Sequence, residues 1–118
     1  MALDRFVYWN DQRPLIKELR GILEDYLGGI GKIEDISRRD HPWWTVTLPG
    51  KPTMPFRRIS GYEKRGEAVE ENKERWFEVF VDDKYVDVMT RQTDEFTNTV
   101  AQGFAELLAR FYGASLKK

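Results

Sequence analysis

The feature that most constrains the fold of this chain is a pair of short runs in which apolar and polar side chains alternate. Residues 76–81 read WFEVFV, residues 84–89 read KYVDVM, and Asp82 and Asp83 separate the two runs. Alternation with a period of two is typical of a β-strand, because successive side chains point to opposite faces of a sheet. The two-residue spacer therefore predicts a β-hairpin with a tight turn.

The length of this turn sets the expected register of the hairpin. A two-residue turn places Phe77 opposite Val88. The next apolar pair toward the turn is then Val79 with Val86, so all four side chains share one face. A three-residue loop would instead place Val79 opposite Asp87, and the hydrophobic pattern therefore favours the shorter turn.

The other face of the hairpin is mixed in character. It carries Trp76, Glu78, Phe80, Tyr85, Asp87 and Met89. This set is too polar for a core and too aromatic for an inert solvent-facing surface, so we expect part of the face to be covered.

In the expected register Glu78 lies opposite Asp87, and like charges in that arrangement destabilise a sheet. One explanation is a neutralising cation such as Arg75, Lys84 or an arginine from residues 37–66. The other is a paired-carboxylate site for a metal ion or acid–base chemistry. We favour structural neutralisation.

Two segments have helical spacing. After a predicted N-cap at Thr93, apolar side chains recur every three or four residues until Gly113, and a second amphipathic stretch covers residues 14–27. The apolar side of the first of these helices consists of Phe96, Val100, Ala101, Phe104, Leu107, Leu108 and Phe111.

Further strands are predicted at residues 3–9, 32–37, 43–48 and 56–62, which gives the order β-α-β-β-β-β-β-α. Because most strands follow one another without a helix, the fold class is α+β. We expect a mainly antiparallel sheet of five to six strands with two helices packed on one face. Residues 1–118 form a single domain, in which the charged residues 63–74 predict a mobile loop.

The composition excludes several classes of chemistry. The chain has no cysteine, so it contains no disulfide, thiolate zinc site or cysteine nucleophile. The N-terminus lacks a signal-peptide pattern, and no apolar run approaches the roughly 18 residues of a membrane span. We expect a cytoplasmic protein that does not associate with membranes.

His41 is the only histidine, so a Ser-His-Asp triad or a histidine metal site would have to include it. It lies in a polar turn between Asp40 and Pro42, where Asp40 could orient it as a general base. An ordinary loop residue is the favoured interpretation. We therefore expect no catalytic residues, no cofactor and no bound metal.

The net charge of −1 hides two blocks of opposite sign. Residues 37–66 carry seven Lys and Arg against two acids, whereas residues 67–87 carry eight acids against three bases. If residues 56–62 pair with the strand that begins near Arg75, the two blocks neutralise each other. If they do not, the basic block and its aromatics could bind single-stranded nucleic acid, although the near-neutral total charge argues against it.

Tryptophan, tyrosine and arginine are the residues that most often anchor interfaces. The candidate partner-binding residues are Trp43, Arg57, Arg58, Trp76, Phe80 and Tyr85. We expect a non-enzymatic binding domain of the inhibitor or accessory type, or a homodimer, that acts through an open aromatic sheet face. The alternative is a pocket between sheet and helices in which Arg57 or Arg58 pairs with a small anionic ligand.

Overall fold

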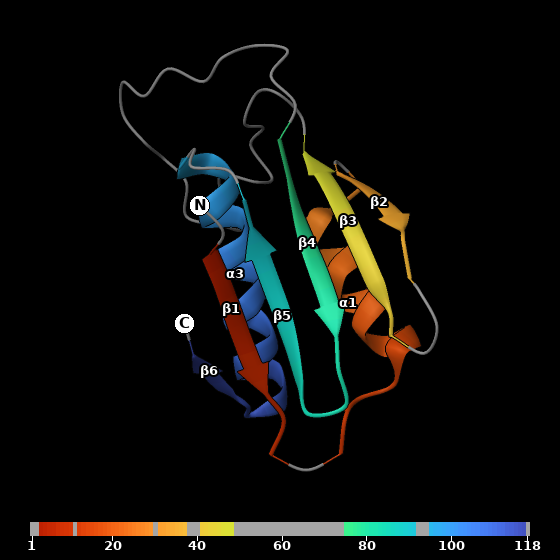
Figure 1. Ribbon diagram of the computed structural model, residues 1–118, viewed down its shortest axis with the longest axis vertical. Helices are drawn as coiled ribbons and strands as arrows, with labels where there is room; N and C mark the ends of the chain where they lie inside the picture. The colour runs from red at the N-terminus through yellow and green to blue at the C-terminus, as the bar shows by residue number, and fades with distance from the viewer. Residues whose placement is uncertain are drawn as a thin grey trace.

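The computed structural model describes residues 3–10, 12–29, 31–37, 41–48, 75–91 and 95–117. In these ranges it contains six strands and two helices in one α+β fold (Figure 1). The elements are β1 (Leu3–Tyr8), α1 (Ile16–Leu27), β2 (Lys32–Asp35), β3 (Trp43–Leu48), β4 (Arg75–Val81), β5 (Tyr85–Thr90), α3 (Glu95–Tyr112) and β6 (Ser115–Lys117). The strand predicted at residues 56–62, the loop predicted at 63–74 and the N-cap predicted at Thr93 lie outside the described residues.

The strands form one sheet in the order β2-β3-β4-β5-β1-β6, and every neighbouring pair is antiparallel. This confirms the predicted fold class and the order of the elements. Strand β6 was not predicted, because its three residues contain a single apolar side chain and carry no pattern. It adds an edge to the sheet by pairing with β1 directly after α3.

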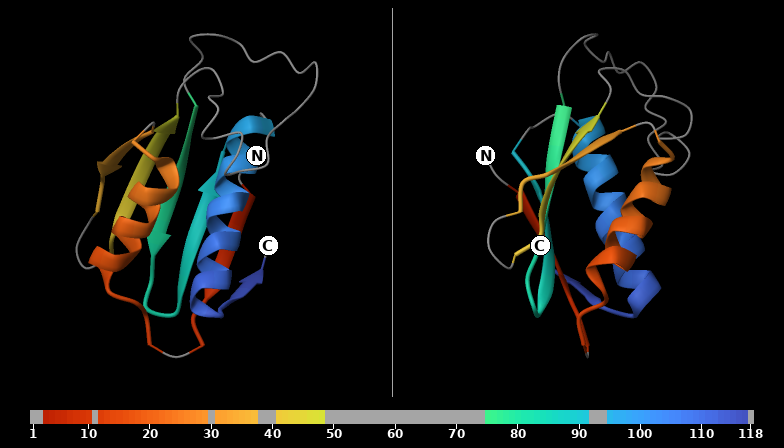
Figure 2. Two further views of the ribbon diagram at one scale, coloured as in Figure 1. Left: turned by 180° about the vertical axis from the view of Figure 1, so that it is seen from behind. Right: turned by 90° about the vertical axis from the view of Figure 1, so that its right-hand side faces the viewer.

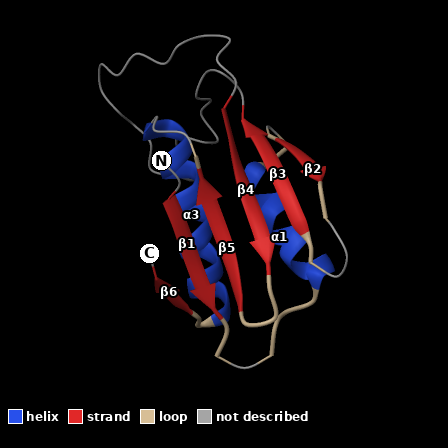
Figure 3. Ribbon diagram, in the orientation of Figure 1, coloured by secondary structure: helices blue, strands red, loops and turns tan. Residues whose placement is uncertain are grey.

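Both helices lie on the same side of the sheet, as the edge-on view in Figure 2 and the colouring in Figure 3 show. The core between the layers consists of the alternate side chains of the central strands and the apolar sides of the helices. Tyr26 links the helices, since its hydroxyl donates to the backbone oxygen of Val100 at 2.7 Å. Neither described helix is long and apolar enough to cross a membrane.

Glycines end both helices. Gly28 has a φ of 62° and donates its N–H to the oxygen of Glu24 at 3.0 Å, which closes α1. Gly113, with a φ of 61°, follows the last residue of α3, and the next N–H, that of Ala114, donates to the oxygen of Ala109 at 2.8 Å. One member of the predicted apolar stripe of α3 does not join the core, since Phe111 is 61% exposed.

The hairpin of β4 and β5 forms as predicted, but its register was wrong. Val79 lies opposite Val88, and Val81 lies opposite Val86. The prediction had placed Phe77 opposite Val88 and Val79 opposite Val86. The set of residues that faces the core is nevertheless the same, because the pairing differs by two residues and side chains alternate with a period of two.

The error has its origin in the turn. The N–H of Asp82 donates to the oxygen of Tyr85 at 2.8 Å, so these two residues still belong to the ladder. The two-residue turn is therefore formed by Asp83 and Lys84, one position later than predicted.

Arg5 is a charged side chain on the helix side of the sheet. Arg5 of β1 is 2% exposed and faces α3. Its Nε donates to Oε1 of Gln102 at 2.7 Å, while the two terminal nitrogens donate to Thr90 and Asn98 at 3.2–3.5 Å. These acceptors are neutral, so the guanidinium is satisfied by hydrogen bonds and not by an adjacent carboxylate.

Candidate binding surface

The face of the sheet that points away from α1 and α3 is here called the open face. No helix that the structure describes lies over it (Figure 2). In β3 and β5 partly exposed residues alternate with buried ones, which identifies the side chains on this face. They include Trp43 and Thr45 of β3, Trp76, Glu78 and Phe80 of β4, Tyr85, Asp87 and Met89 of β5, and Asp4, Phe6 and Tyr8 of β1.

Three rings gather over β3 and β4 and are called the tryptophan cluster. Trp43 lies opposite Phe80 in the ladder, and their rings meet edge to face with centroids 5.6 Å apart. The imidazole of His41 stacks on Phe80, also at 5.6 Å. His41 thus packs against this cluster, and its interpretation as an ordinary loop residue stays a prediction.

Three more rings gather over β1 and β5 and are called the tyrosine cluster. Tyr85 lies 5.3 Å from Phe6 and 5.6 Å from Tyr8, and Phe6 and Tyr8 are 6.1 Å apart. The ammonium group of Lys117 lies over the ring of Tyr8 at 5.9 Å, a cation–π distance. Tyr8 is 37% exposed, which makes this cluster accessible from solvent.

Asp87 lies between the two clusters. Its neighbour in the ladder is Phe80 on one side and Phe6 on the other. One row of side chains therefore crosses five strands of the sheet and runs from Trp43 through Phe80, Asp87 and Phe6 to Lys117. A carboxyl group at the middle of an aromatic row is a costly arrangement, because the rings displace water that would solvate the charge.

The Asp87 carboxyl has few partners that favour its ionised form. Its Oδ1 atom is buried and accepts no hydrogen bond. Burial first, and then the hydrogen bond and charge of the neighbouring Asp4, raise the pKa of Asp87 to about 7, against the opposing effect of the Arg5 backbone and side chain. The two neighbouring carboxyl groups are called the Asp4–Asp87 pair, and the Asp87 carboxyl thus keeps its proton to a much higher pH than an exposed aspartate does.

The predicted pairing of Glu78 with Asp87 was wrong. Glu78 lies opposite Met89, and its Oε2 atom pairs with Nε of Arg91 at 3.2 Å. The reason is the later turn, which moves every pair of the hairpin by two residues. Asp87 does meet a second carboxyl group, but the partner is Asp4 of β1, far away in the sequence.

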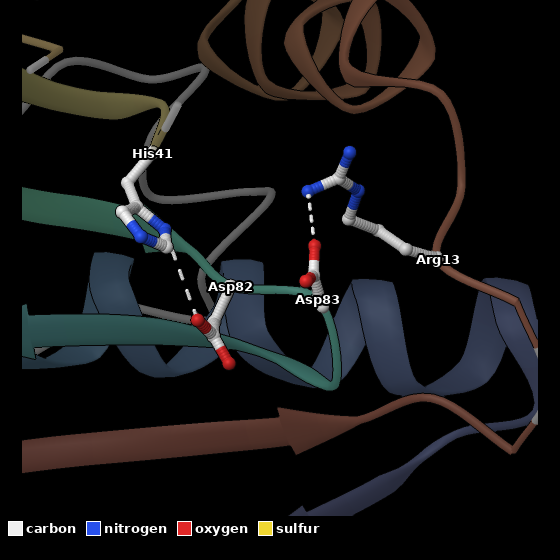
Figure 4. Close-up of polar contacts among 4 residues, drawn as sticks. All are labelled: Arg13, His41, Asp82 and Asp83. Carbon is white, nitrogen blue, oxygen red and sulfur yellow. Dashed lines mark hydrogen bonds and ion pairs between the residues drawn. The ribbon is translucent and has the colours of Figure 1, made fainter. Parts of the chain in front are cut away.

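An ion pair and a histidine–carboxylate contact lie at the tip of the β4-β5 hairpin (Figure 4). An Nη atom of Arg13, ahead of α1, contacts Oδ1 of Asp83 at 3.1 Å, and Nδ1 of His41 lies 3.8 Å from Oδ1 of Asp82. Each contact joins the hairpin to a distant part of the chain. Asp82 and Asp83 are also the two residues that were predicted to form the turn.

Four of the six predicted contact residues lie on the open face. Trp43 and Phe80 are brought into contact, Tyr85 belongs to the other cluster, and Trp76 lies toward the opposite end of β4, across from Thr47. The neighbouring Trp44 is buried in the core at 2% exposure, which decides the choice between the two adjacent tryptophans. Arg57 and Arg58 lie outside the described residues.

The sequence analysis missed three residues of this surface: Asp4, Phe6 and Tyr8. A signal was present, because these residues alternate with Arg5 and Val7 in β1 and so share one face. This alternation does not identify the strand that pairs with β1. Only the pairing of β1 with β5 brings Phe6 beside Asp87 and Tyr8 beside Tyr85.

Among the described residues, no group of three or more histidine, aspartate and glutamate side chains could hold a metal ion. No family model, curated protein or solved structure matches the chain. Two alternatives, a small anionic ligand and single-stranded nucleic acid, depend on residues that include Arg57 and Arg58. Because these arginines lie outside the described residues, both alternatives stay predictions.

Proposed function

We propose that this chain is a non-enzymatic protein-binding domain that receives a partner on the open face. The observation that carries this proposal is the row from Trp43 to Lys117, in which two clusters of rings flank a carboxyl group on a face that no described helix covers. Rigid aromatic side chains with polar groups between them are the usual anchors of protein interfaces, since they bury a large area at a small cost in side-chain entropy.

The size of the face suggests the kind of complex. The four longer strands of the row, β3, β4, β5 and β1, have six or seven residues each, and at a spacing of about 4.8 Å they give a surface of roughly 20 Å by 20 Å. This flat area is about half of the ~800 Å² that each partner buries in a standard interface. A partner that contacts only the open face is therefore expected to bind transiently, and a tighter complex requires additional contacts at the rim.

A foreign partner fits this face better than a second copy of the chain. Two identical chains related by a twofold axis present the same patch to each other. An interface centred on the row would bring two Asp4–Asp87 pairs together. Like charges brought into one desolvated interface oppose association, so the homodimer is the less favoured form of the proposal.

The proposal is tested with peptides selected from a random library on the wild-type protein. Tyr8→Ala removes an accessible ring from the open face, and Phe111→Ala removes an exposed ring from the helical side. We expect Tyr8→Ala to weaken binding of the selected peptides at least tenfold in isothermal titration calorimetry, while Phe111→Ala changes it less than twofold. Thermal unfolding of both variants establishes that each is folded.

The opposite ranking of the two variants would refute the proposal, because the ligand site would then lie on the helices. A library that yields no binder to the wild-type protein also counts against it. Analytical ultracentrifugation of the wild type distinguishes the homodimer: self-association that Tyr8→Ala abolishes would show that a second copy occupies the open face.

A further inference from the structure

We infer that the partner presents a lysine or arginine side chain to the Asp4–Asp87 pair, between the tryptophan cluster and the tyrosine cluster. This inference rests on the proposed function and names the chemistry of the contact. It predicts a partner segment that combines apolar side chains for the rings with a basic side chain for the two carboxyl groups.

The geometry of the row favours a cationic side chain at Asp87. Asp87 has an aromatic neighbour on each side, Phe80 in β4 and Phe6 in β1. A cation that approaches Asp87 from solvent therefore reaches a carboxylate and the rings of two clusters together. Charge-assisted hydrogen bonds and cation–π contacts both favour a lysine or arginine in such a place, and both strengthen when water is excluded.

Among the residues that the structure describes, no lysine or arginine side chain forms an ion pair with the Asp87 carboxyl. Oδ1 of Asp87 is buried without a hydrogen-bond donor. On the described part of the open face, Arg91 is paired with Glu78, and Lys117 lies over the ring of Tyr8. Arg5 acts on Asp87 through the sheet, but its side chain lies on the other face and is bonded to neutral groups.

Protonation of Asp87 couples this contact to pH. Burial, and then the neighbouring Asp4 carboxyl, raise the pKa of Asp87 to about 7. A bound cation favours the ionised carboxylate, so binding must release a proton and must weaken as the pH falls. The ionisable groups around Asp87 that could modify this response are Asp4, Arg5 and Tyr8 of β1, Glu78 of β4, Tyr85 of its own strand, Asp82 at the hairpin tip, and Lys117 of β6.

The test uses the selected peptides on the wild type and on Asp87→Asn. We expect the peptides to contain a lysine or arginine whose replacement by glutamine weakens binding to the wild type at least tenfold. The same replacement should weaken binding to Asp87→Asn less than threefold, because the two changes remove the same contact. Thermal unfolding of Asp87→Asn checks its fold.

Two further measurements test whether binding releases a proton. Affinity for the wild type should fall about tenfold between pH 7.5 and 5.5, and this change should be absent in Asp87→Asn. Calorimetry in phosphate and in Tris should give different apparent enthalpies, which reports the released proton. His41 is the only histidine in the chain, and a His41→Gln variant that keeps the pH dependence assigns it to the carboxyl pair.

The outcomes separate the inference from the proposed function. If Tyr8→Ala weakens binding while the peptides contain no basic residue, or while Asp87→Asn and the wild type behave alike, the open face binds proteins but the carboxyl pair does not select a cation. If Tyr8→Ala leaves affinity unchanged, the proposed function fails as well. Binding of free arginine alone, without the peptide, would identify a small cation as the occupant and overturn the inference of a protein side chain.

Discussion

Replacing Asp87 with asparagine is expected to change how the stability of the protein depends on pH. The substitution keeps the shape of the side chain and removes a carboxyl group that the fold holds in a desolvated position beside Asp4. In the folded protein the pKa of Asp87 is raised from 3.8 to about 7, so the folded state binds a proton over a range in which the unfolded chain does not. The contribution of this group to stability is therefore full below pH 3.8 and is lost as the pH rises through 7.

The magnitude follows from the same two pKa values. A difference of about three pH units corresponds to about 4 kcal/mol at 1.36 kcal/mol each. Asp87 is only partly buried, and water screens it, so about 2 kcal/mol is the expected effect. Relative to Asp87→Asn, the wild type should lose about this amount of unfolding free energy between pH 4 and pH 8.

Urea unfolding of both proteins at intervals across this range measures the difference directly, and Asp25→Asn, at an exposed carboxylate of α1, controls for the loss of a surface charge. Carbon-13 NMR of the Asp87 carboxyl should give a titration midpoint near 7, and Asp4→Asn should lower it because one of its causes is removed. A constant difference in stability at all pH values, or an Asp87 midpoint near 4, would refute the reasoning.

Two predictions concern the fold that supports the surface. Arg5→Met should cost about 3 kcal/mol in urea unfolding, because it leaves the oxygen of Gln102 without this donor and removes the hydrogen bonds to Thr90 and Asn98; a loss below 1 kcal/mol would mean that the arginine was not essential to this part of the core. Gly28→Ala should lower the free energy of unfolding by about 1 kcal/mol, because Gly28 has a φ of 62°. Gly21→Ala should instead raise the melting temperature, because Gly21 lies inside α1 and no atom lies within 4 Å of the added carbon. Equal effects of the two changes would contradict the conformational argument.

The sequence could predict the elements and the face of each side chain because these depend on local periodicity. The alternation in residues 76–89 separates Phe80, Tyr85 and Asp87 from the core residues, and this separation is unaffected by the error in the register. Adjacent Trp43 and Trp44 had to face opposite ways for the same reason. A local signal for the buried one was present, because Trp44 shares its face with Val46 and Leu48, whereas Trp43 shares its face with Thr45 and Thr47.

The composition and local patterns of the chain were sufficient to define two helices, a mainly antiparallel sheet, and an aromatic set outside its core, since a side chain's face follows from a period of two or of 3.6 residues. The tertiary structure alone decided that β1 lies beside β5, and with that decision it placed Phe6 next to Asp87 and Asp4 within reach of the same carboxyl. Strand neighbours, and registers that differ by two residues, present identical alternation. Contacts between distant segments, such as the pairing of β1 with β5 and of β3 with β4, must therefore select among them. The unusual protonation of Asp87 has the same origin, because desolvation is a property of the assembled surface and not of any one segment.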